Sequence, residues 1–198
     1  MDKSGRTIIG SAIVPFRFVF FMWLVFSVEF LGFFGIKKYG IIPRTVDGLI
    51  GIFSAPLLHG SVSHIVSNTV PLLFLGAVLF FFYHKIAGRV FIGCYFMTNI
   101  MVWLFARTAN HIGASGLIYG LAFFLMFSGL FRRDLLSFFI SVVVIFLYGY
   151  IIYGIFPSSV GVSWESHLFG AVVGVFLSYV MRKSGKDEKK ETAEAIGS

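Results

Sequence analysis

The chain has 198 residues, of which 58% are hydrophobic and 13% are charged, and its mean hydropathy is +0.90. This composition excludes a soluble globular domain and is typical of an integral membrane protein. The formal net charge is +7, but the placement of the basic residues follows membrane topology and argues against a nucleic-acid partner. The single cysteine, Cys94, excludes an intramolecular disulfide.

Six apolar runs are long enough to cross a bilayer, whose core of about 30 Å needs roughly 20 apolar residues per helix. They cover residues 16–36, 64–83, 90–106, 114–131, 135–156 and 166–181. The opening residues lack a cleavage site, so the first run is predicted to be a retained helix. The sequence therefore predicts an all-α membrane protein, with one six-helix domain over residues 1–181 and a flexible charged cytoplasmic tail over residues 182–198.

The basic residues divide unevenly between the two sides of the predicted membrane. Six spans place 12 of the 16 Lys and Arg residues on the side that holds both termini. The other side receives four, which are Lys37, Lys38, Arg44 and Arg107. The positive-inside rule then predicts that both termini are cytoplasmic, and that the lipid bilayer is a partner with some attraction for anionic lipid.

Polar side chains gather at the predicted outer ends of three spans. His64 and Asn68 open the second span four residues apart, so they share one helical face. Ser115 opens the fourth span and His167 opens the sixth. Because polar groups inside a membrane are costly, their arrival at one depth from three helices indicates a functional site. A serine nucleophile, a histidine base and nearby donors are the minimum set for acyl transfer.

Glycines surround the serine in the stretch "HIGASGLIYG", residues 111–120. Gly113 permits an unusual turn before the helix, and Gly116, which has no side chain, leaves space beside the hydroxyl for a substrate carbonyl. Small residues four apart let transmembrane backbones approach closely. The glycines expected at this helix contact are Gly116 and Gly120 in the fourth span and Gly170 and Gly174 in the sixth. A developing oxyanion would meet N–H groups of the first helical turn together with donors from His64 and Asn68.

Each of these features also has a purely structural explanation. A serine between glycines occurs at many helix contacts, and a lone histidine such as His167 can simply face water at the interface. A metal site is not indicated, because neither an HExxH motif nor a carboxylate cluster accompanies the histidines. Glu165 is a near neighbour of His167 but points to another helical face, which favours a dyad without an acid. His111 lies in a loop four residues before Ser115, and His167 is preferred as the base.

The same motifs resemble those of the rhomboid family of intramembrane serine proteases. The fourth span carries the family's GxSG pattern as "GASG" at residues 113–116, with Tyr119 at the family's spacing. The second span carries "HIVSN" at residues 64–68, and the sixth carries "HLFGAVVG" at residues 167–174. Six spans with cytoplasmic ends also match, so the resemblance covers nearly the whole chain.

The resemblance implies a compact six-helix bundle with a water-filled cavity open to the outer face of the membrane. In that cavity Ser115 would attack a peptide carbonyl, His167 would act as the base, and Tyr119 would pack against the ring of the base. The residues implied in oxyanion and transition-state stabilisation are His64, Asn68 and Gly113. Substrates would be single-span membrane proteins cleaved in or near the transmembrane segment, and no metal or organic cofactor is expected.

The sequence departs from the family pattern in the first loop. Many members carry a Trp-Arg pair there, whereas this chain has Ile50 and Gly51 at about that place. Apolar loop residues, including Leu49, Ile52 and Phe53, still predict partial immersion of the loop in lipid. The chain resembles the minimal bacterial form, which implies a multi-pass protein of the bacterial inner membrane with its site on the outer side.

Two other functions remain open at this level. A catalytically silent rhomboid-like protein could bind membrane clients without cleaving them, although such relatives typically lose the serine or the histidine. A small transporter would need polar residues continuing towards the cytoplasmic half of the bundle. Spans four and six instead become apolar or small in that half.

Overall fold

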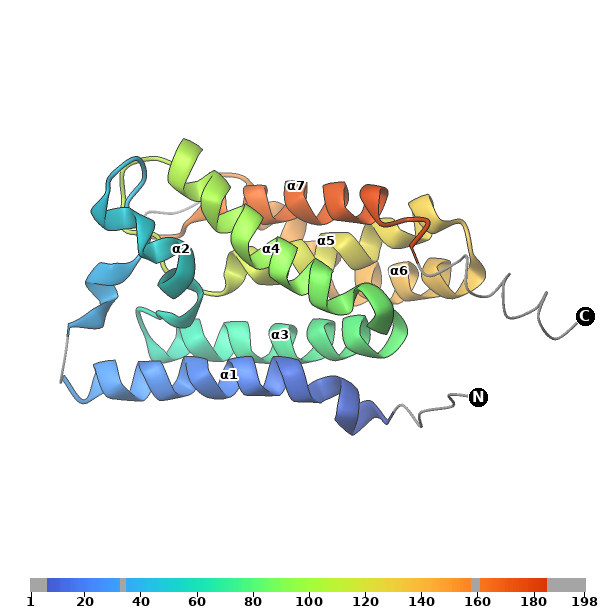
Figure 1. The fold of residues 1–198 in the computed structure, drawn as a ribbon, viewed down its shortest axis with the longest axis horizontal. Coiled ribbons are helices and arrows are strands. Elements are labelled where there is room, and N and C mark those ends of the chain that lie inside the picture. Colours follow the sequence, from blue (N-terminus) through green and yellow to red (C-terminus); the bar gives the residue numbers. More distant parts are fainter. Residues whose placement is uncertain (1–6, 33–34, 158–160, 185–198) are drawn as a thin grey trace, which may run out of the picture.

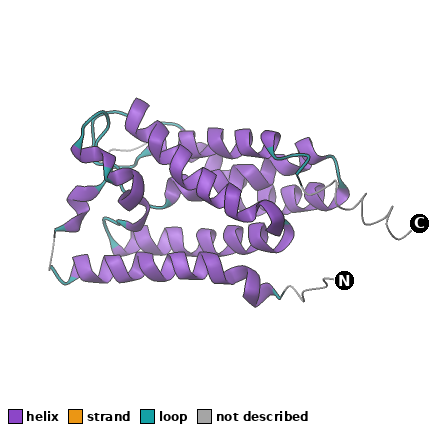
Figure 2. Cartoon of the chain, in the orientation of Figure 1, coloured by secondary structure: helices purple, strands orange, loops and turns teal. Residues whose placement is uncertain are grey.

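The computed structural model describes residues 7–32, 35–157 and 161–184, and all regular elements in these ranges are helical (Figure 2). Five helices are long and apolar enough to cross a membrane. They are α1 (Ile8–Phe30), α3 (Val62–Phe82), α4 (His84–Phe105), α5 (Ser115–Arg132) and α6 (Leu135–Tyr148), which the 3-10 helix η4 (Gly149–Ile155) prolongs. The shorter apolar helix α7 (Trp164–Val180) corresponds to the sixth predicted span. The prediction of an all-α membrane bundle is confirmed.

Helix starts differ from the apolar runs because capping residues, and not hydropathy, decide where a helix begins. The first helix starts at Ile8, well before the predicted residue 16, because the Thr7 side chain accepts a hydrogen bond of 3.0 Å from the backbone N–H of Gly10. Only Tyr83 separates α3 from α4, so the basic residues Lys85 and Arg89 fall inside the first turns of α4. The predicted tail lies largely in residues 185–198, outside the described part of the chain.

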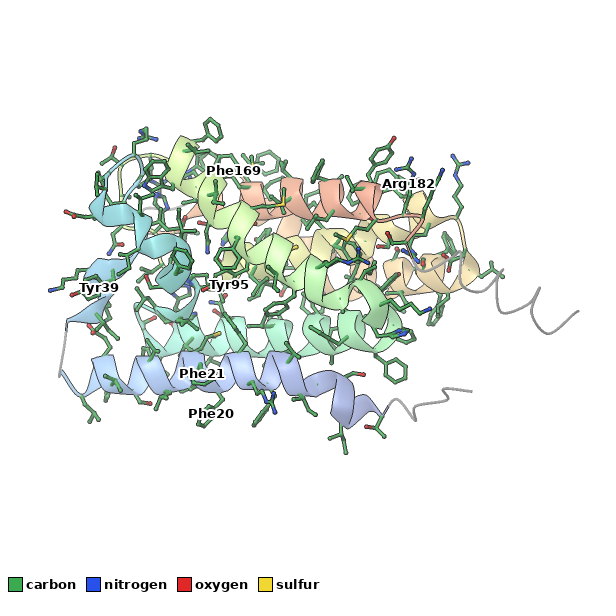
Figure 3. The ribbon with its side chains drawn as sticks, viewed as in Figure 1. Phe20, Phe21, Tyr39, Tyr95, Phe169 and Arg182 are labelled. Carbon is green, nitrogen blue, oxygen red and sulfur yellow. The ribbon has the colours of Figure 1, made fainter. Side chains whose placement is uncertain are left out.

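Consecutive long helices alternate in direction, so α3, α5 and α7 all begin at the same end of the bundle (Figure 1). Tyr39 lies at that end and Arg182 lies at the opposite end, where α1 begins (Figure 3). Helix α5 is central, because 67% of its apolar window is buried against 28–33% for the other four long helices. Phe20, by contrast, projects from α1 away from the bundle, as a lipid-facing side chain would (Figure 3).

Helices α5 and α7 form the most extensive contact in the bundle. Their backbones touch at two levels, because a Cβ atom on Gly170 would overlap the carbonyl oxygen of Gly116, and one on Gly174 would overlap that of Gly120. Gly116 and Gly120 in turn face Thr98 and Cys94 of α4, where an added Cβ would come within 2.9 Å of side-chain carbon. Any larger residue at these positions would move α7 away from α5.

The described part of the first loop, from residue 35 onwards, contains four short helices: η1 (Ile36–Tyr39), η2 (Asp47–Leu49), α2 (Gly51–Ser54) and η3 (Ala55–Leu57). Trp103 of α4 donates to the carbonyl of Thr45 at 2.9 Å, and Arg44 donates to the carbonyl of Ala106 at 2.7 Å. Gly51 packs directly on the backbone of Ile41 and leaves no room for a side chain. An arginine and a tryptophan therefore anchor the loop from positions other than those the family pattern suggests.

Several apolar side chains of this loop point outwards. Val46 is 82% exposed and Phe53 is 64% exposed, while Leu49 and Ile50 are also exposed and Ile52 is half-buried. Burying such a patch in hydrocarbon is favourable, so its exposure fits the expected lipid contact of the loop.

Candidate active site

One cavity of about 1070 Å³ opens at the end of the bundle where α3, α5 and α7 begin. Five of the residues singled out in the sequence line this cavity: Ser115, His167, His64, Asn68 and Tyr119. Gly113 lies beside it, against the ring of His64, and the four glycines of the α5–α7 contact lie among buried residues of those helices. The structure thus brings residues separated by about a hundred positions to a single polar site.

A sharp turn before α5 positions Ser115. Gly113 has φ +112°, a region that favours glycine, and its N–H donates to the carbonyl of Ala55 at 2.8 Å. The helix then starts at Ser115, so the first N–H groups of α5 are directed towards the cavity end of the bundle. Among the described residues the Ser115 hydroxyl has no hydrogen-bond partner, unlike most hydroxyls buried in membrane helices.

Two contacts orient the ring of His167. The ring of Tyr119 stacks on it with centroids 4.2 Å apart and an interplanar angle of 2°. The Nδ1 atom lies 2.9 Å from the carbonyl oxygen of Gly154, which can only accept, so Nδ1 carries the proton. In the neutral ring Nε2 is then an unprotonated acceptor. Within the described chain Ser115 and His167 are not hydrogen-bonded to each other, and such bonds often form only when substrate is bound.

Gly154 of η4 is a site residue that the sequence did not indicate. Besides binding His167 through its carbonyl, it lies so close to Tyr119 that a Cβ atom there would overlap the phenol oxygen. The same Cβ would lie 3.3 Å from Nδ1 of His167. The chain contains 22 glycines, and no local pattern separates this one from its neighbour Gly149.

His64 and Asn68 form the opposite wall of the cavity. A Cβ on Gly113 would lie 2.7 Å from Nε2 of His64, so only glycine admits this imidazole. The Asn68 amide donates to the backbone carbonyl of His64 at 2.7 Å, which uses one of its two N–H groups and fixes the carboxamide. His59 packs edge-on against His64, with ring centroids 4.9 Å apart. The pKa of His59 is lowered to about 4, mainly by burial and to a smaller extent by the nearby ring of His64.

Comparison with known proteins identifies the fold family. A family profile for the Rhomboid domain matches residues 47–184, which include every residue of the cavity wall named above. The chain belongs to the rhomboid family. It is 35% identical to uncharacterised proteins of Mycobacterium tuberculosis and Mycobacterium bovis over 209 residues, which cover 98% of this chain and 84% of each relative. An uncharacterised protein of Mycobacterium leprae is 32% identical over 216 residues, covering 99% of this chain and 80% of that relative.

Rhomboid proteins are generally intramembrane serine proteases, so the family agrees with a serine and a histidine in one cavity. In residues 7–32, 35–157 and 161–184 no three His, Cys, Asp or Glu side chains converge as metal ligands would. Glu29, near the end of α1, accepts a hydrogen bond of 2.6 Å from the backbone N–H of Ile36 and so holds the start of the first loop.

Proposed function

We propose that this rhomboid is an intramembrane serine endopeptidase with Ser115 as nucleophile and His167 as base. The observation that carries the proposal is the shared cavity, in which the Ser115 hydroxyl has no partner among the described residues and the His167 ring is held with Nε2 unprotonated. A base in this state accepts the proton that the serine must lose. Tyr119 supports the base by stacking on its ring.

The proposed reaction has two stages. In the first, Ser115 Oγ attacks the peptide carbonyl while its proton passes to Nε2 of His167, and His167 then gives that proton to the leaving amine as the C–N bond breaks. In the second, a water molecule loses a proton to His167 and attacks the acyl-enzyme, and His167 returns that proton to Ser115 Oγ as the ester C–O bond breaks and the new carboxyl end is released. No metal or organic cofactor is needed.

Each tetrahedral intermediate carries an oxyanion that needs donors. The backbone N–H of Ser115, the ring of His64 and the second N–H of Asn68 are the candidates, with Gly113 providing the space that the imidazole occupies. Preorganised donors of this kind stabilise the transition state more than the substrate, because the charge develops only as the bond forms.

The proposed location is the bacterial inner membrane, with the cavity facing outwards. The four basic residues at the cavity end contrast with the basic clusters at the other end, which supports cytoplasmic termini. The mycobacterial relatives support a bacterial membrane. The proposed substrates are therefore single-span proteins, cleaved in or near the outer part of their transmembrane segment.

Reconstitution into liposomes tests this function. The purified protein is mixed with single-span reporter proteins that carry small residues near the outer membrane boundary, and products are identified by mass spectrometry. We expect cleavage by the wild type and none by Ser115→Ala. Stable binding of the reporters without cleavage would instead establish the catalytically silent, client-binding function.

A further inference from the structure

A network of polar contacts beside the proposed dyad joins the loop before α5 to the start of α7. Two of its members, His111 and Glu165, have no role in the chemistry above, yet they are only 2% and 3% exposed. We call this cluster the loop clamp, and its residues are Arg107, His111, Ser163, Glu165 and Ser166. It lies between the segment that leads to Ser115 and the turn that carries His167.

The hydrogen-bond partners of His111 determine which nitrogen of the neutral ring carries the proton. Its Nε2 lies 2.9 Å from the carbonyl oxygen of Arg107, so Nε2 carries the proton and donates. In the neutral ring Nδ1 then accepts, and its partner at 2.6 Å is the hydroxyl of Ser163. With its proton directed to His111, Ser163 accepts in turn from the Ser166 hydroxyl, also at 2.6 Å. The chain of bonds therefore runs from α7 into the loop before α5.

Ser163 is placed as the N-cap of α7, where a serine hydroxyl normally accepts from an N–H of the first helical turn. Here its side chain makes no capping bond and serves His111 instead. A helix without a side-chain cap is less stable. The hydroxyl of Ser163 therefore bonds His111 at the expense of a bond that would stabilise the start of α7.

A second set of contacts runs parallel to the first. The Arg107 guanidinium lies 3.2 Å from Oε1 of Glu165 and donates to the carbonyl of Val162 at 2.8 Å. The other carboxylate oxygen, Oε2, is buried without a partner among the described residues, which is a costly state for an acid. A carboxylate kept there holds Arg107 at the start of α7.

Backbone hydrogen bonds to the first loop hold the loop before α5 in place. His111 exchanges two backbone hydrogen bonds of 2.9 Å with Ile41 of the first loop, and Gly113 is bonded to Ala55. Because the backbone of His111 is held, its side chain can set where α7 starts. His167 lies one helical turn after Ser163.

We propose that His111 is a positioning residue which, through Ser163, sets the approach of the His167 ring to Ser115. This inference rests on the proposed protease function. Proton transfer between serine and histidine depends steeply on geometry, and a misplacement of about 1 Å can lower turnover about 100-fold. Because Arg107, His111 and Ser163 also line the cavity, the test must separate turnover from substrate binding, and the positioning role predicts that the loss falls on turnover.

Two amides that each mimic half of the imidazole test the proposal. His111→Asn places an oxygen near the position of Nδ1 and keeps the acceptor for Ser163, while His111→Gln places an N–H near Nε2 and keeps only the bond within the loop. His111→Leu keeps neither. We expect kcat to fall at least about tenfold in the Leu and Gln variants with KM within about twofold of wild type, and the Asn variant to recover most of that loss.

Thr108→Val is the matched control, because Thr108 lies in the same loop but bonds Arg44 and not α7. Ser163→Ala should lower kcat as His111→Leu does, and combining the two should add little, as for partners in one contact. Reporter cleavage is measured in liposomes after equilibrium unfolding confirms that each variant is folded.

Wild-type kcat in His111→Leu, rescue by Gln equal to that by Asn, or a loss confined to KM would each overturn the positioning role while leaving the protease function in place. Absence of cleavage by the wild type would instead overturn the protease function, and the inference with it.

Discussion

The serines near the two ends of α5 differ in the hydrogen bonds that their hydroxyl groups make. Near its C-terminal end, Ser128 donates to the carbonyl of Phe124 at 2.7 Å and lies 3.4 Å from the hydroxyl of Ser178. At its N-terminal end, Ser115 starts the helix and faces a cavity without a partner among the described residues. A hydroxyl bonded to its own helix serves packing, whereas an unpartnered one beside an oriented histidine is available for chemistry.

The largest expected effect separates these two serines directly. Ser115→Ala and His167→Ala should each lower kcat by more than about 10³-fold, because each removes a group that takes part in bond making. Ser128→Ala should leave kcat unchanged and cost about 1 kcal/mol of unfolding free energy at most, the usual value of one hydrogen bond. Reporter cleavage and equilibrium unfolding in mixed micelles measure both, and loss of activity in Ser128→Ala would remove the contrast between the two ends.

A smaller effect is expected at the oxyanion wall. Asn68→Ala should lower kcat by up to about 10²- to 10³-fold. The loss is smaller if the backbone N–H of Ser115 and the ring of His64 supply most of the oxyanion stabilisation. Thr69→Val is the control, since the Thr69 hydroxyl bonds Trp23 and its own helix, away from the cavity. Steady-state cleavage kinetics measure the difference, and unchanged turnover in Asn68→Ala would make this amide a structural residue only.

The next prediction concerns two glycines of one 3-10 helix. Gly154→Ala should lower kcat about tenfold, because its Cβ would displace Tyr119 and disturb the support of the His167 ring. Gly149→Ala should be nearly neutral, since the nearest atom to its Cβ is an ordinary contact at 3.7 Å. Parallel kinetics on the two variants check this, and equal effects would argue against a role for the Tyr119 stack.

The last prediction concerns stability, and the pH response of the cavity end of the bundle. The pKa of His59 is about 4 in the fold against 6.5 unfolded, so the unfolded chain binds more protons between these values and stability falls with acid. Lowering the pH from 7.5 to 5 should cost the wild type about 2 kcal/mol more than it costs His59→Gln, which does not titrate there. Equilibrium unfolding at both pH values measures it, and identical losses would place His59 in a wetter site.

The sequence predicted the helical bundle because long apolar runs in lipid have one stable backbone form. It could not predict where α1 and α4 begin, since single capping and turn residues, Thr7 and Tyr83, decide that. The residues that line the cavity were found because polar groups at membrane depth are rare. The partner that fixes His167 was not, because Gly154 acts through its backbone carbonyl, which has no sequence signature.

His111 and Glu165 illustrate the same limit. Sequence reasoning set His111 aside because it lies in a loop, and Glu165 because it points to another helical face than His167. Their contacts cross from one loop to another helix, over distances of 52 and 58 residues along the chain. Such pairs become visible only once the fold brings the start of α7 against the loop before α5.

The account is tested most directly by locating the serine that reacts with a fluorophosphonate probe. The probe forms a covalent bond only with an activated serine, and peptide mass spectrometry identifies the residue that carries it. We predict an adduct on Ser115 in the wild type, and its loss in His167→Ala although Ser115 is still present. An adduct on another serine, or labelling of Ser115 that does not depend on His167, would contradict the assignment of the site.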